Sequence, residues 1–473
     1  MTYRSSRPRL LRPLFALLMM CAAFAVQPAL AQGPSASATL DATERRAVVE
    51  QIARLLQEHY VFPDVGATSG AHLRTRLAAG AFDGMADPQT YAEALTSELQ
   101  SINRDKHMRV RLRPPRDASM EQADPGAAVA RQLRDMRGRN FGFERVEHLN
   151  GNVGYLDLRY FAPPELARGL ATATMQLLSN SDAIIIDLRR NDGGSPELVQ
   201  LLCSYFFDTR THLNSLYWRR GDRTQEFWTL DDLPGRRLPR VPLFVLTSSG
   251  TFSGAEEFSY NMQTRNRATL IGETTGGGAN PGDEMAVNDR FAIFVPTGRA
   301  INPVTGTSWE GVGVKPDVAV DASAALDSAL VRARAAARVY ANAEIARETT
   351  TRELMTRRLA EARTLIGRRE LSAAEKMAGE ALSTALAESA ADERIINLLG
   401  YRELRAGEKA LAIAIFKANV AAFPASANTH DSLGEAYMEN GDRELAIRSY
   451  RRSLEHDPSN ANARAMLERL GSR

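Results

Sequence analysis

The chain has 473 residues, of which 44% are hydrophobic and 25% are charged, a composition typical of ordinary globular proteins. This length allows two or three domains with cores that need no cross-links. The 59 Lys and Arg residues nearly balance the 57 Asp and Glu residues, so the net charge of +2 argues against nucleic acid or a membrane surface as a partner.

The first 31 residues differ from the rest of the chain. Four arginines between positions 4 and 12 precede an apolar run at 14–26, and Ala29-Leu30-Ala31 closes the segment. This order is typical of a signal peptide, and the run is shorter than the roughly 20 residues of a membrane-spanning helix. We therefore predict cleavage after Ala31, export to the periplasm and no membrane span in the mature protein. Cys203 is then the only cysteine left, and we predict that it is a buried small side chain.

Three predicted domains, at 40–103, 104–330 and 345–473, follow a small-residue linker at 32–40. Residues 40–103 have apolar side chains at three-four spacing between Pro, Gly and Asp breaks, which predicts an N-terminal helical bundle. Residues 114–139 are polar and weakly periodic, and we interpret them as a connecting or covering segment.

From position 153 apolar strands alternate with helical segments. The runs AIIIDL and LFVL have no polar alternation, which is typical of strands that are covered on both faces. We predict an α/β domain over 104–330.

Residues 345–473 repeat with a period of 34 residues, which is the tetratricopeptide period. The matching pairs are Gly400 and Gly434, Ala412 and Ala446, Phe416 and Tyr450, and Pro424 and Pro458. A degenerate unit around Gly367 would bring the number of repeats to three. We predict an all-α tetratricopeptide-repeat domain.

Three glycine-rich segments interrupt the α/β region. RRNDGGSPE (189–197) follows a strand and opens a helix, so its backbone N–H groups could form an oxyanion hole; it matches neither nucleotide-binding glycine pattern. TSSGTFSGAEEFSY (247–260) places Ser253 at a helix start, where Ser253 and Glu256 fit a capping box. GETTGGGANPGD (272–283) is interpreted as too flexible to be core and suited to border a bound chain.

Four motifs together resemble one family, the tail-specific or carboxy-terminal processing serine proteases, with the tricorn protease core and the interphotoreceptor retinoid-binding protein. They are IIIDLRRNDGG (184–194), TSSGTFSGAEEF (247–258), IGETTGGG (271–278) and WEGVGVKPD (309–317). The resemblance covers residues 40–325. It implies a crotonase-like (ClpP/crotonase) α/β core, peptide-bond hydrolysis, and no cofactor or metal.

The resemblance also implies roles for individual residues. Ser253 matches the nucleophile, and the Gly254, Gly193 and Gly194 backbone matches the oxyanion donors. The processing branch has a lysine base 25 positions after the nucleophile, where this chain has Gly278. A serine still needs a base. The tricorn branch uses a histidine and a glutamate, which His107 in RDKHMRVRL and Glu310 in WEGVGVKP match.

The expected function is an exported serine endopeptidase that acts on protein or peptide substrates, with the repeats recruiting a substrate or a protein partner. Three alternatives stay open. The fold could bind apolar ligands or peptides without catalysis, it could hydrolyse another ester or amide, or the repeats could be the main function as a scaffold. No convincing PDZ pattern is present, so the sequence does not establish specificity for carboxyl-terminal tails.

Overall fold

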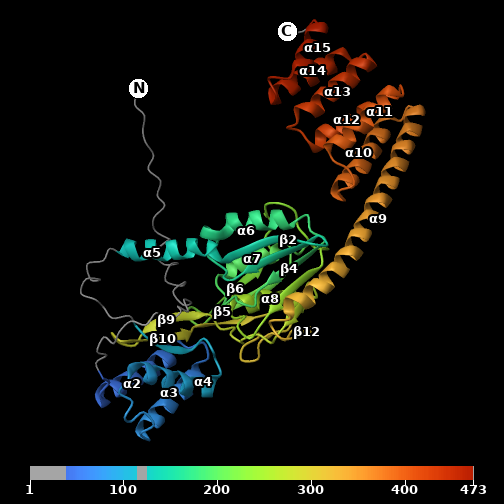
Figure 1. Ribbon diagram of the computed structural model, residues 1–473. Helices are drawn as coiled ribbons and strands as arrows, with labels where there is room; N and C mark the ends of the chain where they lie inside the picture. Colours follow the sequence, from blue (N-terminus) through green and yellow to red (C-terminus); the bar gives the residue numbers. More distant parts are fainter. Residues whose placement is uncertain (1–38, 114–124, 472–473) are drawn as a thin grey trace, which may run out of the picture. The chain divides into compact units, whose positions relative to one another are not determined.

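The computed structural model describes residues 39–113 and 125–471, which form two compact units (Figure 1). The division lies between Tyr340 and Ala341, inside the long helix α9 (Ala325–Gly367). The predicted signal peptide at 1–31 lies outside the described residues. No helix in the described ranges is both long enough and apolar enough to cross a membrane.

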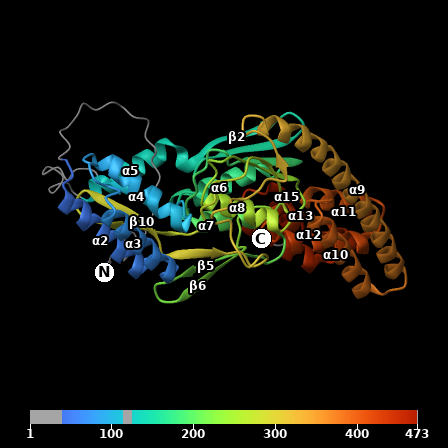
Figure 2. The same cartoon turned by 90° about the horizontal axis from the view of Figure 1, so that it is seen from below.

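The first unit begins with three helices, as the spacing of apolar residues predicts. They are α2 (Ala42–His59), α3 (Pro63–Ala78) and α4 (Pro88–Asn103). Asp41 and Asp87 cap α2 and α4 by accepting the backbone N–H groups of Glu44 and Thr90, each at 2.7 Å. The apolar faces of these helices share one core with strands β1 (Arg109–Leu112) and β10 (Phe291–Pro296). Both views show β10 beside the helices (Figures 1 and 2).

The centre of this unit is a six-stranded mixed sheet in the order β12-β8-β7-β4-β3-β2. β2 is antiparallel to β3, and the other neighbouring strands are parallel. The strands are β2 (Phe143–Leu149), β3 (Val153–Leu158), β4 (Ala183–Asp187), β7 (Leu243–Thr247), β8 (Thr269–Gly272) and β12 (Val318–Ala319).

Both faces of the central sheet are covered. Ile184 and Ile186 pack with the core beneath α6 (Pro164–Leu178), α7 (Pro196–Ser204) and α8 (Gly254–Thr264). Ile185 points to the other face, where alanines from the first turns of α9 pack. The apolar runs without alternation therefore have the predicted cause. Cys203 is buried in α7, as predicted.

Two small antiparallel sheets complete the first unit, in the orders β1-β10-β9 and β11-β5-β6. Their strands are β1 (Arg109–Leu112), β5 (His212–Trp218), β6 (Arg223–Trp228), β9 (Gly282–Ala286), β10 (Phe291–Pro296) and β11 (Gly298–Ile301). Within the segment interpreted as a connection, residues 125–138 form helix α5 (Pro125–Gly138), followed by the short turn η2 (Asn140–Gly142).

The second unit is helical. After the end of α9 it contains α10 (Leu371–Ala387), α11 (Glu393–Arg405), α12 (Lys409–Ala422), α13 (Ala427–Asn440), α14 (Arg443–His456) and α15 (Ala461–Arg469). A methyl group on Gly400 would lie 2.5 Å from the Phe416 ring, and one on Gly434 would lie 3.0 Å from the Tyr450 ring. The same contact between a glycine and an aromatic ring thus recurs in two successive helix pairs.

Candidate active site

Three loops leave the central sheet at the same edge, because β4, β7 and β8 are parallel neighbours. They contain the Gly193-Gly194 pair, Ser253 and the glycine-rich segment from Thr274 to Gly278. Ligands of open α/β sheets gather at the carboxyl ends of strands. The topology therefore brings the three glycine-rich motifs of the sequence to one place.

Ser253 is half-buried and immediately precedes α8 with φ +53° and ψ −119°. A positive φ is uncommon for a residue with a side chain, and such strain concentrates at functional sites. The Ser253 N–H donates to Glu256 Oε2 at 2.9 Å, which is the glutamate half of the predicted capping box. The helix start therefore holds the serine in an unusual backbone conformation.

The glycine pair lies directly against Ser253. Gly193 and Gly194 have φ +108° and +131°, and a methyl group on Gly193 would lie 2.7 Å from Ser253 Cβ. The Gly193 N–H donates to Asn191 Oδ1 at 2.9 Å, so this predicted oxyanion donor is already engaged. Among the described residues, the N–H groups of Gly194 and Gly254 have no acceptor. A methyl on Gly254 would lie 3.2 Å from the Gly194 nitrogen, so these two groups are close neighbours.

The interpretation of the third glycine-rich segment as too flexible to be core is wrong, because Gly277, Gly278 and Ala279 are buried. The Glu256 carboxylate accepts the N–H groups of Gly277 and Gly278 at 2.6 and 2.8 Å, and also the Thr275 hydroxyl. Buried backbone groups are tolerated when they have partners. Burial raises the pKa of Glu256 to about 7, although these donors act in the opposite direction.

His107 is buried, and only 6% of it is exposed. Its ring packs against Phe252 at 4.6 Å and Phe294 at 5.8 Å between centroids. Burial, and secondarily the charge of Arg109, lower the pKa of His107 to about 3, so the imidazole is neutral. A neutral imidazole has a free lone pair that can accept a proton, and the lowered pKa makes it a weaker base than an exposed histidine.

Two carboxylates flank His107. Asp105 Oδ1 lies 4.0 Å from His107 Nδ1, and one ligand-type atom from each of Asp105, His107 and Glu310 falls within 4.8 Å of the others. Glu310 Oε2 accepts the N–H groups of Ala279 and Asn280 at 2.5 and 3.1 Å. Burial raises the pKa of both Asp105 and Glu310, and the charge of Asp105 raises that of Glu310 further.

The structure explains why a glycine stands where the processing branch has a lysine. A Cβ atom on Gly278 would lie 2.2 Å from Phe252 Cζ and 2.8 Å from His107 Cε1. The space that a longer side chain would need is thus filled by the Phe252 ring and the His107 ring. Gly278 and buried His107 are two parts of one packing arrangement.

The structure brings the predicted residues together in two groups. Ser253, Gly193, Gly194 and Gly254 form one group, and His107 with Glu310 forms the other. Phe252 connects them, because it precedes Ser253 and packs on His107. In the described part of the chain, no hydrogen bond joins the Ser253 hydroxyl to the His107 ring. Asp105 and Phe252 were not predicted; the position of Asp105, two residues before His107, is the signal that could have suggested it.

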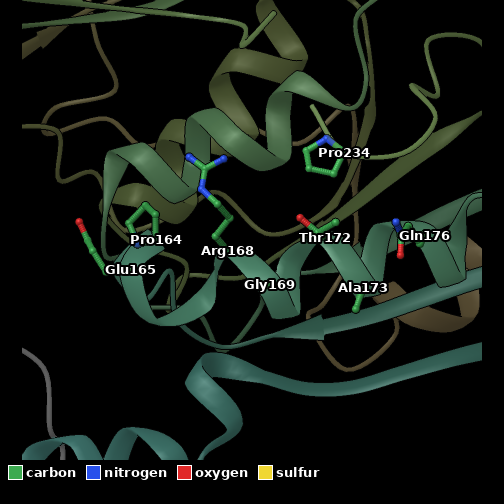
Figure 3. Close-up of a pocket in the computed structure, with 8 residues that line it drawn as sticks. All are labelled: Pro164, Glu165, Arg168, Gly169, Thr172, Ala173, Gln176 and Pro234. Atoms are coloured by element: carbon green, nitrogen blue, oxygen red, sulfur yellow. The ribbon is translucent and has the colours of Figure 1, made fainter. Parts of the chain in front are cut away.

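An open hollow lies elsewhere on the first unit, over α6 (Figure 3). Its lining residues are Pro164, Glu165, Arg168, Gly169, Thr172, Ala173, Gln176 and Pro234. None of the predicted site residues is among them, so this hollow is separate from the candidate site.

Two family models match the chain. Residues 152–320 match peptidase family S41, and residues 39–137 match the N-terminal domain of peptidase S41 in eukaryotic IRBP. Ser253, Glu310 and the three glycines lie in the first match, and His107 lies in the second. The two matches together contain every predicted site residue.

Curated relatives carry names of processing proteases. A carboxy-terminal-processing protease of Bartonella bacilliformis is 27% identical over 37% of this chain and 40% of its own length. A carboxyl-terminal-processing protease of Synechocystis sp. is 29% identical over 41% of each chain. The chain thus matches about two fifths of the length of these relatives. The solved photosystem II D1 C-terminal processing protease aligns over 59% of this chain and 93% of its own, with 15% identity and a TM-score of 0.38.

Proposed function

Because residues 152–320 belong to peptidase family S41, we propose that this protein is a serine peptidase that hydrolyses peptide bonds through an acyl-enzyme. The proposal rests on one observation at the carboxyl edge of the central sheet. There Ser253, which has a positive φ, lies beside Gly194 and Gly254, whose N–H groups have no acceptor among the described residues. Two convergent N–H donors beside a hydroxyl are what an acyl-transfer site needs.

In the proposed reaction, the Ser253 oxygen attacks the substrate carbonyl carbon, and the carbonyl oxygen becomes an oxyanion. The N–H groups of Gly194 and Gly254 stabilise this charge, at the amino end of α8, where the helix dipole adds to their effect. Collapse of the intermediate expels the amine and leaves an ester on Ser253, which water then hydrolyses. Gly193 has a supporting role, because its N–H holds the loop through Asn191.

His107 is the proposed general base. Its Nδ1 faces Asp105, which leaves Nε2 to take the Ser253 proton and to return it to the leaving amine. Asp105 and Glu310 stabilise the imidazolium that forms. Because no hydrogen bond joins the hydroxyl and the ring among the described residues, the reaction requires a shift that brings these atoms within about 3 Å. Phe252 packs on His107 and adjoins Ser253, so a movement of Phe252 would change the position of one relative to the other.

The proposal extends to the rest of the chain. The α/β core is proposed to be crotonase-like, and residues 345–473 are proposed to be a tetratricopeptide stack that recruits a substrate or a protein partner. The recurring contacts of Gly400 with Phe416 and of Gly434 with Tyr450 support the repeat assignment. Export to the periplasm is proposed from the residues at 1–31 alone.

The test is hydrolysis of casein by purified residues 32–473, beside Ser253→Ala. Ser249→Ala is the matched control, because Ser249 is an exposed serine in the same loop. We expect at least a ~10⁴-fold loss of activity in Ser253→Ala and wild-type activity in the control. Retained turnover in folded Ser253→Ala would refute the assignment of the nucleophile.

A further inference from the structure

Two buried polar atoms around His107 have no hydrogen-bond partner within the described residues 39–113 and 125–471. They are His107 Nδ1 and Glu310 Oε1. Most buried polar atoms in proteins have a partner, so an exception requires an explanation. Both atoms belong to the cluster in which Asp105, His107 and Glu310 each offer one ligand-type atom within 4.8 Å of the others. A neutral imidazole nitrogen and a carboxylate oxygen both present lone pairs, so a cation could satisfy the two together.

The separation of His107 and Asp105 suits a bridging metal ion better than a direct hydrogen bond. His107 Nδ1 and Asp105 Oδ1 are 4.0 Å apart, which is too long for a hydrogen bond. Two metal–ligand bonds of about 2.0–2.2 Å can span up to about 4 Å. A small inward movement of either residue would give the shorter separation of tetrahedral ligands.

The two carboxylates are held from behind by other groups. Glu310 Oε2 accepts the N–H groups of Ala279 and Asn280, which leaves Oε1 for the cluster. Asp105 Oδ2 accepts the Asn280 side-chain amide at 2.9 Å and the Tyr60 hydroxyl at 3.3 Å. Outer contacts of this kind orient the ligands of metal sites.

The local charge favours a cation. Asp105 and Glu310 place two acidic side chains beside one imidazole ring. Arg109 is the opposing charge near His107. Lys106 is directed elsewhere, because its ammonium group donates to the Gly276 carbonyl oxygen at 2.6 Å.

We propose that Asp105, His107 and Glu310 bind a divalent ion of the zinc class, and that this ion reversibly inhibits the enzyme. One imidazole nitrogen with two carboxylate oxygens is a donor set that suits Zn²⁺ better than Mg²⁺ or Ca²⁺, which prefer oxygen alone. The inhibition rests on the proposed function, whereas the binding does not.

The chemistry of the imidazole explains the inhibition. A neutral imidazole carries one proton, and a metal on Nδ1 confines that proton to Nε2. Nε2 is the atom that must accept the Ser253 proton in the proposed reaction. The same ion also binds the carboxylates of Asp105 and Glu310, so they are no longer available to stabilise the imidazolium. Binding of metal and action as a base are therefore mutually exclusive for His107.

Binding can be measured without any activity assay. Protein without a histidine tag, stripped with EDTA, is titrated with Zn²⁺ by calorimetry, beside Asp105→Asn and Glu310→Gln. The matched control is His456→Gln, which removes another histidine with a buried ring nitrogen that lacks a hydrogen-bond partner in the described part of the chain. We expect the affinity to fall at least about tenfold in both site variants and to stay unchanged in the control. Equal affinity in the wild type and in both folded site variants would overturn the site.

Anomalous diffraction from zinc-soaked crystals of the wild-type protein locates the ion even if a variant does not fold. A peak between Asp105, His107 and Glu310 supports the proposal, and peaks only elsewhere refute it. Casein hydrolysis then tests the inhibition: we expect saturating Zn²⁺ to abolish it and EDTA to restore it. Zinc in the site without any proteolysis in the metal-free protein would leave the metal site standing and refute the proposed function. Full activity with the site occupied would overturn the inhibition alone.

Discussion

Around Ser253 the candidate site consists of backbone, whereas around His107 it consists of side chains. The first region is made of loop residues with positive φ, at Gly193, Gly194 and Ser253, and its chemistry comes from N–H groups. The second region is a cluster of side chains in which Asp105 and His107 are almost fully buried and Glu310 is half-buried. Substitutions in the two regions should therefore reduce activity for different reasons. In the backbone region they change the conformation of the loop, and in the side-chain region they change the charge around His107.

The largest expected effect comes from the side-chain region. His107→Gln removes the proposed base, and we expect casein hydrolysis to fall about 10⁴-fold or more, as for other members of a catalytic triad. His148→Gln is the control, because His148 is exposed on β2. If His107→Gln kept wild-type activity in a steady-state assay, the base would have to be another residue.

A lysine at position 278 tests how the two regions are joined. In Gly278→Lys, Cβ would collide with Phe252 and His107, so we expect no Ser–Lys dyad but a roughly 10²-fold loss of activity, together with a destabilisation of about 1–3 kcal/mol. Thermal unfolding and casein hydrolysis measure the two effects. Gly169→Lys is the control, because nothing lies within 4 Å of a Cβ atom there. An active Gly278→Lys enzyme would contradict the packing argument.

A smaller loss is expected in the backbone region when its support is removed. Asn191 is fully buried; it accepts the Gly193 N–H and donates to the Leu158 carbonyl oxygen at 2.8 Å. In Asn191→Ala the glycine pair loses this anchor, and we expect about a tenfold loss in kcat with little change in KM, less than the ~10²–10³-fold effect of losing an oxyanion donor itself. Asn180→Ala is the control, because it changes an exposed asparagine, and it should keep the wild-type kcat. An unchanged kcat in Asn191→Ala would show that the Gly193-Gly194 pair keeps its position without the hydrogen bond to Asn191.

The smallest effect is a pH dependence of stability that belongs to the side-chain region. Burial raises the pKa of Glu310 from 4.5 to about 8, so the folded chain holds this proton more tightly than the unfolded chain. Its contribution to stability is fully present below about pH 4.5 and is lost as the pH rises through about 8. We therefore expect the free energy of unfolding, measured in urea, to fall less between pH 5 and 8 in Glu310→Gln than in the wild type. Glu284→Gln is the control, because it changes an exposed glutamate, and it should keep the wild-type dependence of the unfolding free energy on pH. The same dependence in Glu310→Gln would disprove the raised pKa of Glu310.

Much of the fold could be predicted from the sequence. Buried strands such as AIIIDL and the N-terminal helices depend on local periodicity, which one segment carries by itself. The places of Ser253 and the glycine pair at a helix start and a strand end have local signatures, but their roles in the site came from the resemblance. His107 and Glu310 were chosen by resemblance, since no local pattern marks a histidine as a base.

By itself, then, the sequence determined which segments become strands and helices and where backbone N–H groups are left at a strand end. Only the tertiary structure decided that Gly193 is engaged by Asn191, that Glu256 and Glu310 hold the glycine-rich loop in the interior, and that Asp105 meets Glu310 beside His107. The physical reason is that backbone conformation follows from neighbours in the chain. Burial, pKa and contact between distant side chains depend on which surfaces pack together, and these exist only in the folded protein.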